Sequence, residues 1–108
     1  MNVLVVSCNH HKAGVQLRER LAFSNAELLN SAYSQWRTIH PDSEIVVLST
    51  CNRVEIYAAD ERSNDGVSFD DITRFISQFH NVPPDEFVNS VLAHSGTAAV
   101  EHLFEVAC

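Results

Sequence analysis

The sequence has little of several residue types, and each scarcity excludes a class of protein. Its 108 residues contain three cysteines, three glycines, three prolines and a single lysine. Three cysteines are too few, and odd in number, for a disulfide framework, which favours a reducing compartment; we therefore expect a cytoplasmic protein. No run of about 18 apolar residues is present, so we expect no membrane span, and the apolar residues 1–8 lack the basic start of a signal peptide.

Motifs for metals and nucleotides are also absent. Six histidines and three cysteines occur, but none form a Cys-x-x-Cys or His-x-x-x-His pair, so we predict no metal site. There is no P-loop and no Gly-x-Gly-x-x-Gly, and hence no nucleotide fingerprint. Fourteen acidic residues against seven basic ones give a net charge of −7, which argues against a free-standing nucleic-acid binder.

Regular hydrophobic periodicity is present along most of the chain and predicts helices and strands. A length of 108 residues suits one small domain. Ser24 and Glu27 match a capping box, and Ser68 and Thr97 are further predicted N-caps. We expect strands at residues 3–8, 44–49, 54–58 and 88–93, and helices at residues 25–39, 69–79, 15–22 and from 98 onward.

The order of these elements is β-α-β-β-α-β followed by one more helix, which predicts an α+β fold, a ferredoxin-like sandwich. Right-handed crossovers make the first and second strands parallel, with the third strand antiparallel between them. The C-terminal ends of the first two strands then meet at one edge of the sheet. Residues 8–10 should therefore lie near residues 50–52.

The segment Ser-Thr-Cys-Asn-Arg at residues 49–53 is the most unusual part of the sequence. Its polar residues join two strands where a hairpin would prefer Asn-Gly or Asp-Gly. A cation at Arg53 and the N–H groups of a turn would favour the thiolate of Cys51, which is the nucleophilic form. The alternative is a small buried Cys51, with Arg53 in a surface salt bridge.

Other polar residues have two interpretations each. His10 and His11 follow the first strand and are either a base or substrate contact or ordinary loop residues. Residues 18–20 (Arg-Glu-Arg) are either a solvated helix face or a site for a carboxylate or phosphate. His102 points away from the predicted apolar face of the last helix, toward water or a cleft. That apolar face comprises Val100, Leu103, Phe104 and Ala107.

Four segments, taken in order, resemble the glutamyl-tRNA reductase family, and the resemblance covers the whole chain. Residues 48–57 (LSTCNRVEIY) resemble the family signature, and residues 18–23 (RERLAF) its Arg-Glu-Arg segment. Residues 9–15 resemble its opening Asn-His-Lys-Thr-Ala-Pro, although His-Lys replaces Lys-Thr and Gly14 replaces Pro. Residues 99–107 (AVEHLFEVA) resemble its His-Leu helix, and Cys108 replaces a usual Ser.

The resemblance implies that residues 1–108 are part of an N-terminal catalytic domain, incomplete at its C-terminus, with the NADPH-binding and dimerisation domains outside this chain. It implies an oxidoreductase that reduces glutamyl-tRNA to glutamate 1-semialdehyde with NADPH, through a cysteine thioester. That reaction opens the five-carbon route to tetrapyrroles such as heme. The chain alone would not complete it. Further implied partners are a second copy in a full-length homodimer and the downstream aminomutase.

The resemblance also assigns residues. It makes Cys51 and His102 catalytic, assigns substrate binding to Thr50, Cys51, Asn52 and Arg53, and adds Asn9 and His10 as candidate substrate contacts. Arg53 suits the glutamate side-chain carboxylate. His102 would orient or protonate groups near Cys51, so we predict it within reach of Cys51, directly or through one water. The competing hypothesis is a non-catalytic regulatory or protein-interaction domain with a structural Cys51.

Overall fold

Four strands form one antiparallel sheet in the order β2-β3-β1-β4 in the computed structural model, which describes residues 2–9, 11–61 and 66–107. The strands are β1 (Asn2–Asn9), β2 (Ser43–Ser49), β3 (Arg53–Asp60) and β4 (Leu92–Ser95). Since β3 pairs antiparallel with both β1 and β2, those two strands run parallel to each other. The predicted ferredoxin-like arrangement is therefore confirmed.

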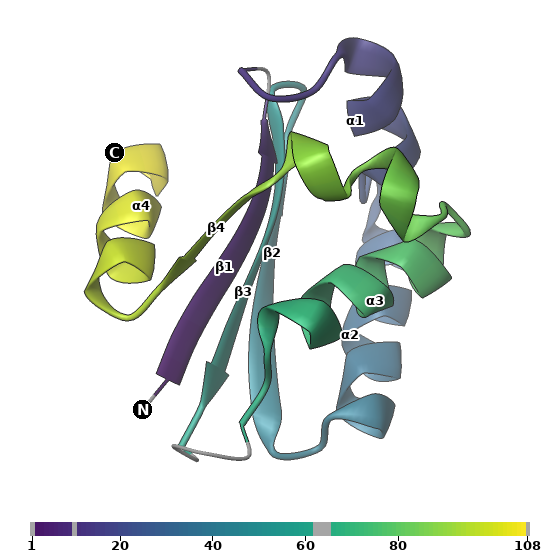
Figure 1. The fold of residues 1–108 in the computed structure, drawn as a ribbon. Coiled ribbons are helices and arrows are strands. Elements are labelled where there is room, and N and C mark those ends of the chain that lie inside the picture. Colours follow the sequence, from purple (N-terminus) through teal and green to yellow (C-terminus); the bar gives the residue numbers. More distant parts are fainter. Residues whose placement is uncertain (1, 10, 62–65, 108) are drawn as a thin grey trace.

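Helices cover both faces of this sheet, as Figure 1 shows. On one side lie α1 (Val15–Leu21), α2 (Ala26–Ile39) and α3 (Phe69–His80), and on the other α4 (Thr97–Ala107). Two short 3₁₀ helices, η1 (Pro84–Glu86) and η2 (Val88–Ser90), lead into β4. The larger core includes Val6, Ile56, Trp36 and Phe75, and the smaller core under α4 includes Val5, Tyr57 and Ala99. Burial on both faces explains why β1 is an almost unbroken apolar run.

The fourth strand begins later than predicted. Residues Val88–Ser90 form η2, and the strand covers Leu92–Ser95. The side chain of Phe87 is fully buried, and its carbonyl accepts a hydrogen bond from the N–H of Ser90 at 2.8 Å. Burial of this ring holds the segment in a tight turn, so the apolar residue at position 88 belongs to that turn and not to the strand.

The predicted capping box at Ser24 and Glu27 is wrong by one residue. Asn25 is the N-cap of α2, and its side chain accepts a hydrogen bond from the N–H of Leu28 at 2.9 Å. Ser24 and Asn25 are both good caps, so sequence could not decide between them. The predicted cap at Ser68 is confirmed, with Asp71 completing a capping box.

We expect Asn25→Ala to lower the free energy of unfolding by about 1 kcal/mol, because the N–H of Leu28 loses its acceptor. Ser24→Ala is the matched control and should change it by less than about 0.5 kcal/mol, since Ser24 lies outside the helix. Urea unfolding of both variants measures the difference. Equal losses would contradict the assignment of the cap.

Two predictions for the last helix are also wrong. Thr97 is the first residue of α4 and not its N-cap. Gly96 precedes it with φ +60°, and its carbonyl accepts from the N–H of Val100 at 3.2 Å. Leu103 packs on the smaller core as predicted, but Val100 and Phe104 are exposed, Phe104 by 64%. The helix rests on the sheet through the fully buried Ala99 instead, whose small side chain permits close approach.

Candidate functional site

Residues Thr50–Asn52 form the turn between β2 and β3, at the same end of the sheet as the end of β1 (Figure 1). The N–H of Thr50 donates to the carbonyl of Arg53 at 2.8 Å, and the N–H of Asn52 donates to Thr50 Oγ1 at 3.2 Å. The hydroxyl of Thr50 therefore stabilises a turn that has no glycine. Cys51 is exposed at its tip, so the alternative that Cys51 is a small buried residue is wrong.

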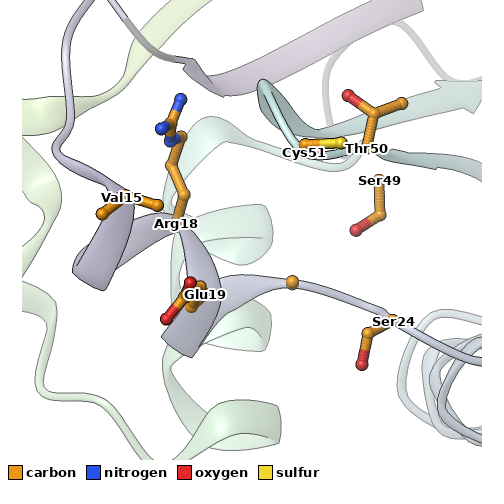
Figure 2. Close-up of a pocket in the computed structure, with 8 residues that line it drawn as sticks. Val15, Arg18, Glu19, Ser24, Ser49, Thr50 and Cys51 are labelled. Atoms are coloured by element: carbon orange, nitrogen blue, oxygen red, sulfur yellow. The ribbon is translucent and has the colours of Figure 1, made fainter.

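A pocket of about 350 Å³ lies between this turn and α1 (Figure 2). It is lined by Val15, Arg18, Glu19, Ala22, Ser24, Ser49, Thr50 and Cys51. Figure 2 shows Arg18 reaching from α1 toward the turn that carries Thr50 and Cys51. The N–H of Phe23 donates to Ser49 Oγ at 2.9 Å, which fixes the chain after α1 to the end of β2.

The two arginines of the Arg-Glu-Arg segment have different surroundings. Arg20 pairs with Glu86 at the surface, at 3.1 Å. Arg18 Nη1 donates to the carbonyl of Asn52 at 3.4 Å, and its Nε is buried without a hydrogen-bond partner among the described residues. Arg20 therefore fits the interpretation as a solvated helix face, and Arg18 lines the same pocket as Cys51.

A second polar group lies on the opposite face of the sheet, under α4. At its centre is the side chain of Glu55, which is fully buried. Its Oε2 lies 2.6 Å from His102 Nε2, and it accepts from Arg53 Nη1 at 3.3 Å and from the hydroxyl of Ser7. Its Oε1 accepts from the hydroxyl of Tyr57 at 2.8 Å. A buried carboxylate is stable only with such partners.

The ionised form of Glu55 is the favoured one. Burial by itself raises the pKa of this carboxyl, but hydrogen bonds from Ser7, His102 and Tyr57 outweigh burial and leave the pKa below its ordinary value. Burial, and then the hydrogen bond to Glu55 and the negative charge of that carboxylate, raise the pKa of the Tyr57 hydroxyl. The tyrosine therefore stays protonated and acts as a donor.

Histidine and carboxylate burial together predict how stability depends on pH. Burial lowers the pKa of His80 below its ordinary value of 6.5, so the unfolded chain binds its proton more readily. The stability this residue contributes is complete above pH 6.5 and is lost as the pH falls below it. Glu55, with its lowered pKa, contributes stability that is lost only at lower pH, below its ordinary value of 4.5.

We therefore expect the free energy of unfolding to fall in two stages on acidification, the first with a slope of at most about 1.4 kcal/mol per pH unit. His80→Phe should flatten the first stage and leave the second, since it removes one titrating group only. Urea unfolding at intervals from pH 7.5 to 3 measures both. An unchanged slope between pH 6.5 and 5 in this variant would contradict the role of His80.

Some of the predicted site residues come together and others do not. Asn9 pairs with Arg53 across β1 and β3, which confirms that the two loops share one end of the sheet. The side chain of Asn9 is buried, and its Oδ1 accepts from the N–H of His11 at 2.9 Å, so it shapes the loop after β1. His10 lies outside the described residues. Cys8, near the end of β1, is buried.

His102 faces the sheet and not water, with 13% of its side chain exposed. Its ring also lies near those of Tyr57 and His94, with centroids 6.5 and 5.2 Å away. Within the described part of the chain His102 bonds to Glu55 and has no direct hydrogen bond to Cys51. The other form of the prediction, contact with Cys51 through one water, stays a prediction. Arg53, two residues after Cys51, connects the turn to this group through the same carboxylate oxygen.

Sequence reasoning missed Ser7, Glu55 and Tyr57. The available signal was a polar residue in each of two apolar runs, Ser7 in β1 and Glu55 in β3, which face each other in the strand register. Among the described residues, no three His, Cys, Asp or Glu side chains cluster as metal ligands. In that same part of the chain, no helix combines the length and apolar character that crossing a bilayer requires.

Comparison with known proteins identifies what this chain resembles. A family model described as the N-terminal domain of glutamyl-tRNA(Glu) reductase matches residues 6–108. A glutamyl-tRNA reductase of Thermodesulfovibrio yellowstonii is 38% identical over 112 residues, which cover 99% of this chain and 26% of that protein. One of Rhodopirellula baltica is 36% identical over 107 residues, which cover 99% and 25%. The chain thus spans about a quarter of the length of these curated relatives.

Proposed function

The chain belongs to the glutamyl-tRNA reductase family, and we propose that it captures the glutamyl group of glutamyl-tRNA on Cys51. One observation carries this proposal: Cys51 is exposed at a turn that lines a pocket, with Arg18 on the facing wall. A thiol placed this way can meet a large substrate that enters from outside, which a buried thiol cannot do.

The proposed reaction of this chain is an acyl transfer. The thiolate of Cys51 attacks the carbonyl carbon of the ester that joins glutamate to the tRNA 3′ end. A carbon–sulfur bond forms, the ester carbon–oxygen bond breaks, and the released ribose oxygen takes up a proton. The product is a thioester, which is more electrophilic than a carboxylate and so prepares the glutamyl group for reduction.

Substrate binding is proposed for the residues around the turn. Arg53 has N–H donors beyond the one that Glu55 uses, and we assign them to the carboxylate of the glutamate side chain. Arg18 lines the pocket, and its buried Nε lacks a hydrogen-bond partner among the described residues. Thr50 lines the pocket, and Asn52 follows Cys51 in the same turn; we assign substrate binding to both. His102 is the proposed group that orients or protonates near Cys51.

The reduction step is proposed for a whole protein of this family and not for this chain alone. Hydride from NADPH would release glutamate 1-semialdehyde, at the start of the five-carbon route to tetrapyrroles. The glycines of this chain stand alone at positions 14, 66 and 96. Residues that are isolated in this way do not form the glycine-rich loop that cradles a pyrophosphate, so we assign no residue of this chain to the dinucleotide.

Mass spectrometry tests the acyl transfer directly. We expect the chain, incubated with glutamyl-tRNA at neutral pH, to gain the mass of one glutamyl group, and peptide mapping to place it on Cys51. Prior treatment with iodoacetamide should block the gain. A glutamyl group on another residue, or none at all under conditions where Cys51 is alkylated readily, would overturn the proposal.

The second candidate function is a non-catalytic interaction domain, and the exposed Val100 and Phe104 on α4 favour it. The two candidates differ in whether an accessible Cys51 takes up the glutamyl group. Rapid alkylation of Cys51 followed by the glutamyl adduct supports the enzyme. Rapid alkylation without the adduct supports the interaction domain, and Cys8 is the internal control that should stay unmodified in the folded chain.

A further inference from the structure

Glu55 is the residue through which two parts of the candidate site are joined. Its carboxylate is fully buried between β3 and α4, and it receives donors from both. His102 Nε2 and Arg53 Nη1 both bond to the same oxygen, Oε2, at 2.6 and 3.3 Å. Ser7 donates to that oxygen as well. One partner of Glu55, His102, therefore lies in α4, and another, Arg53, lies two positions after Cys51.

We propose that Glu55 is a positioning residue, which fixes the tautomer of His102 and holds His102 and Arg53 in one orientation relative to the Cys51 turn. The proposal deepens the proposed function and rests on it, since it adds a residue that acts on two of the groups assigned to the acyl transfer.

The tautomer follows from the chemistry of the hydrogen bond. An ionised carboxylate can only accept, so Nε2 of His102 must carry the hydrogen of their contact. In the neutral ring the other nitrogen, Nδ1, then has a free lone pair. That nitrogen is the one able to accept a proton or orient a donor. Without the carboxylate, the ring would be free to place its hydrogen on either nitrogen.

The orientation follows from burial. A side chain with 13% of its surface exposed has little room to rotate, and the charge-assisted bond to Glu55 adds direction to that packing. Arg53 is more exposed, at 24%, so its bond to Glu55 is the main restraint on its guanidinium. Removal of the outer partners that orient metal-ligating histidines typically changes activity about 10–100-fold, and we expect an effect on the same scale here.

Nitrogen-15 NMR of the imidazole ring tests the tautomer. In the unmodified chain at neutral pH, we expect the hydrogen of His102 on Nε2. In Glu55→Gln the amide can donate as well as accept, so the Nδ1–H form should gain population. Tyr57→Phe is the matched control, because it also removes one buried hydrogen bond of Glu55, the one to the other oxygen, Oε1. This variant should leave the tautomer of His102 unchanged.

Formation of the glutamyl adduct tests the consequence. We expect Glu55→Gln to slow it about 10–100-fold and Tyr57→Phe to slow it less than about 3-fold. The proposal is overturned if His102 carries its hydrogen on Nδ1 in the unmodified chain, a result that does not depend on whether the variant folds. It is also overturned if both variants slow the adduct equally. If the unmodified chain forms no adduct, the proposed function fails, and the tautomer still decides the role of Glu55.

Discussion

The Cys51→Ser variant is expected to form the glutamyl adduct at least about 10³-fold more slowly than the unmodified chain, the scale on which loss of a nucleophile acts. Serine keeps the size of the side chain, and position 51 is exposed, so the fold should not change. The hydroxyl is a much weaker nucleophile than a thiolate unless a base activates it. Among the described residues, His102 bonds to Glu55 and has no direct hydrogen bond to position 51, so it does not hold a serine hydroxyl in the contact that this activation requires.

Cys8→Ala is the control for this experiment. Cys8, near the end of β1, is the other free cysteine among the described residues, and burial raises its pKa while the charge of Arg18 opposes that rise. A buried thiol in its protonated form does not attack an ester, so the adduct should form at a similar rate in Cys8→Ala. Thermal unfolding of both variants shows whether they are folded. A persistent adduct in Cys51→Ser would refute the assignment of the nucleophile.

The arrangement of the sheet could be predicted from sequence because the constraints were local and consistent. Alternating and continuous apolar runs gave the strands, and the handedness of crossovers placed β3 between β1 and β2. The packing face of α4 could not be predicted in the same way. That helix has apolar residues on most sides, and the choice between Ala99 and Phe104 depends on how closely the sheet lets the helix approach.

The exposed part of the candidate site could also be predicted from the sequence, and its buried part could not. Cys51 stood out because polar residues interrupt two strands without a glycine. Glu55 is an ordinary residue for an alternating strand, where an acid would be expected to face water. Its burial depends on α4, which carries His102. That residue is separated from Glu55 by 47 positions in the sequence. A single sequence contains no local pattern that links two such positions.

Trp36→Ala should have the largest effect on stability, a loss of about 3–5 kcal/mol in the free energy of unfolding. The indole is 1% exposed and packs edge-on against Phe75, with ring centroids 5.2 Å apart, so α2 and α3 lose their shared contact. Phe104→Ala removes another aromatic ring, but from the exposed side of α4, and should cost less than about 0.5 kcal/mol.

Trp36→Phe separates the ring from its polar atom. The indole N–H of Trp36 is buried without a hydrogen-bond partner among the described residues, and this raises the free energy of the folded state. Phenylalanine keeps most of the apolar surface and removes the N–H, so the loss should be much smaller than for alanine, about 1 kcal/mol. Urea unfolding measures all three variants. A loss in Phe104→Ala as large as that in Trp36→Ala would mean that Phe104 is buried, and would refute the face of α4 on which the contact between His102 and Glu55 depends.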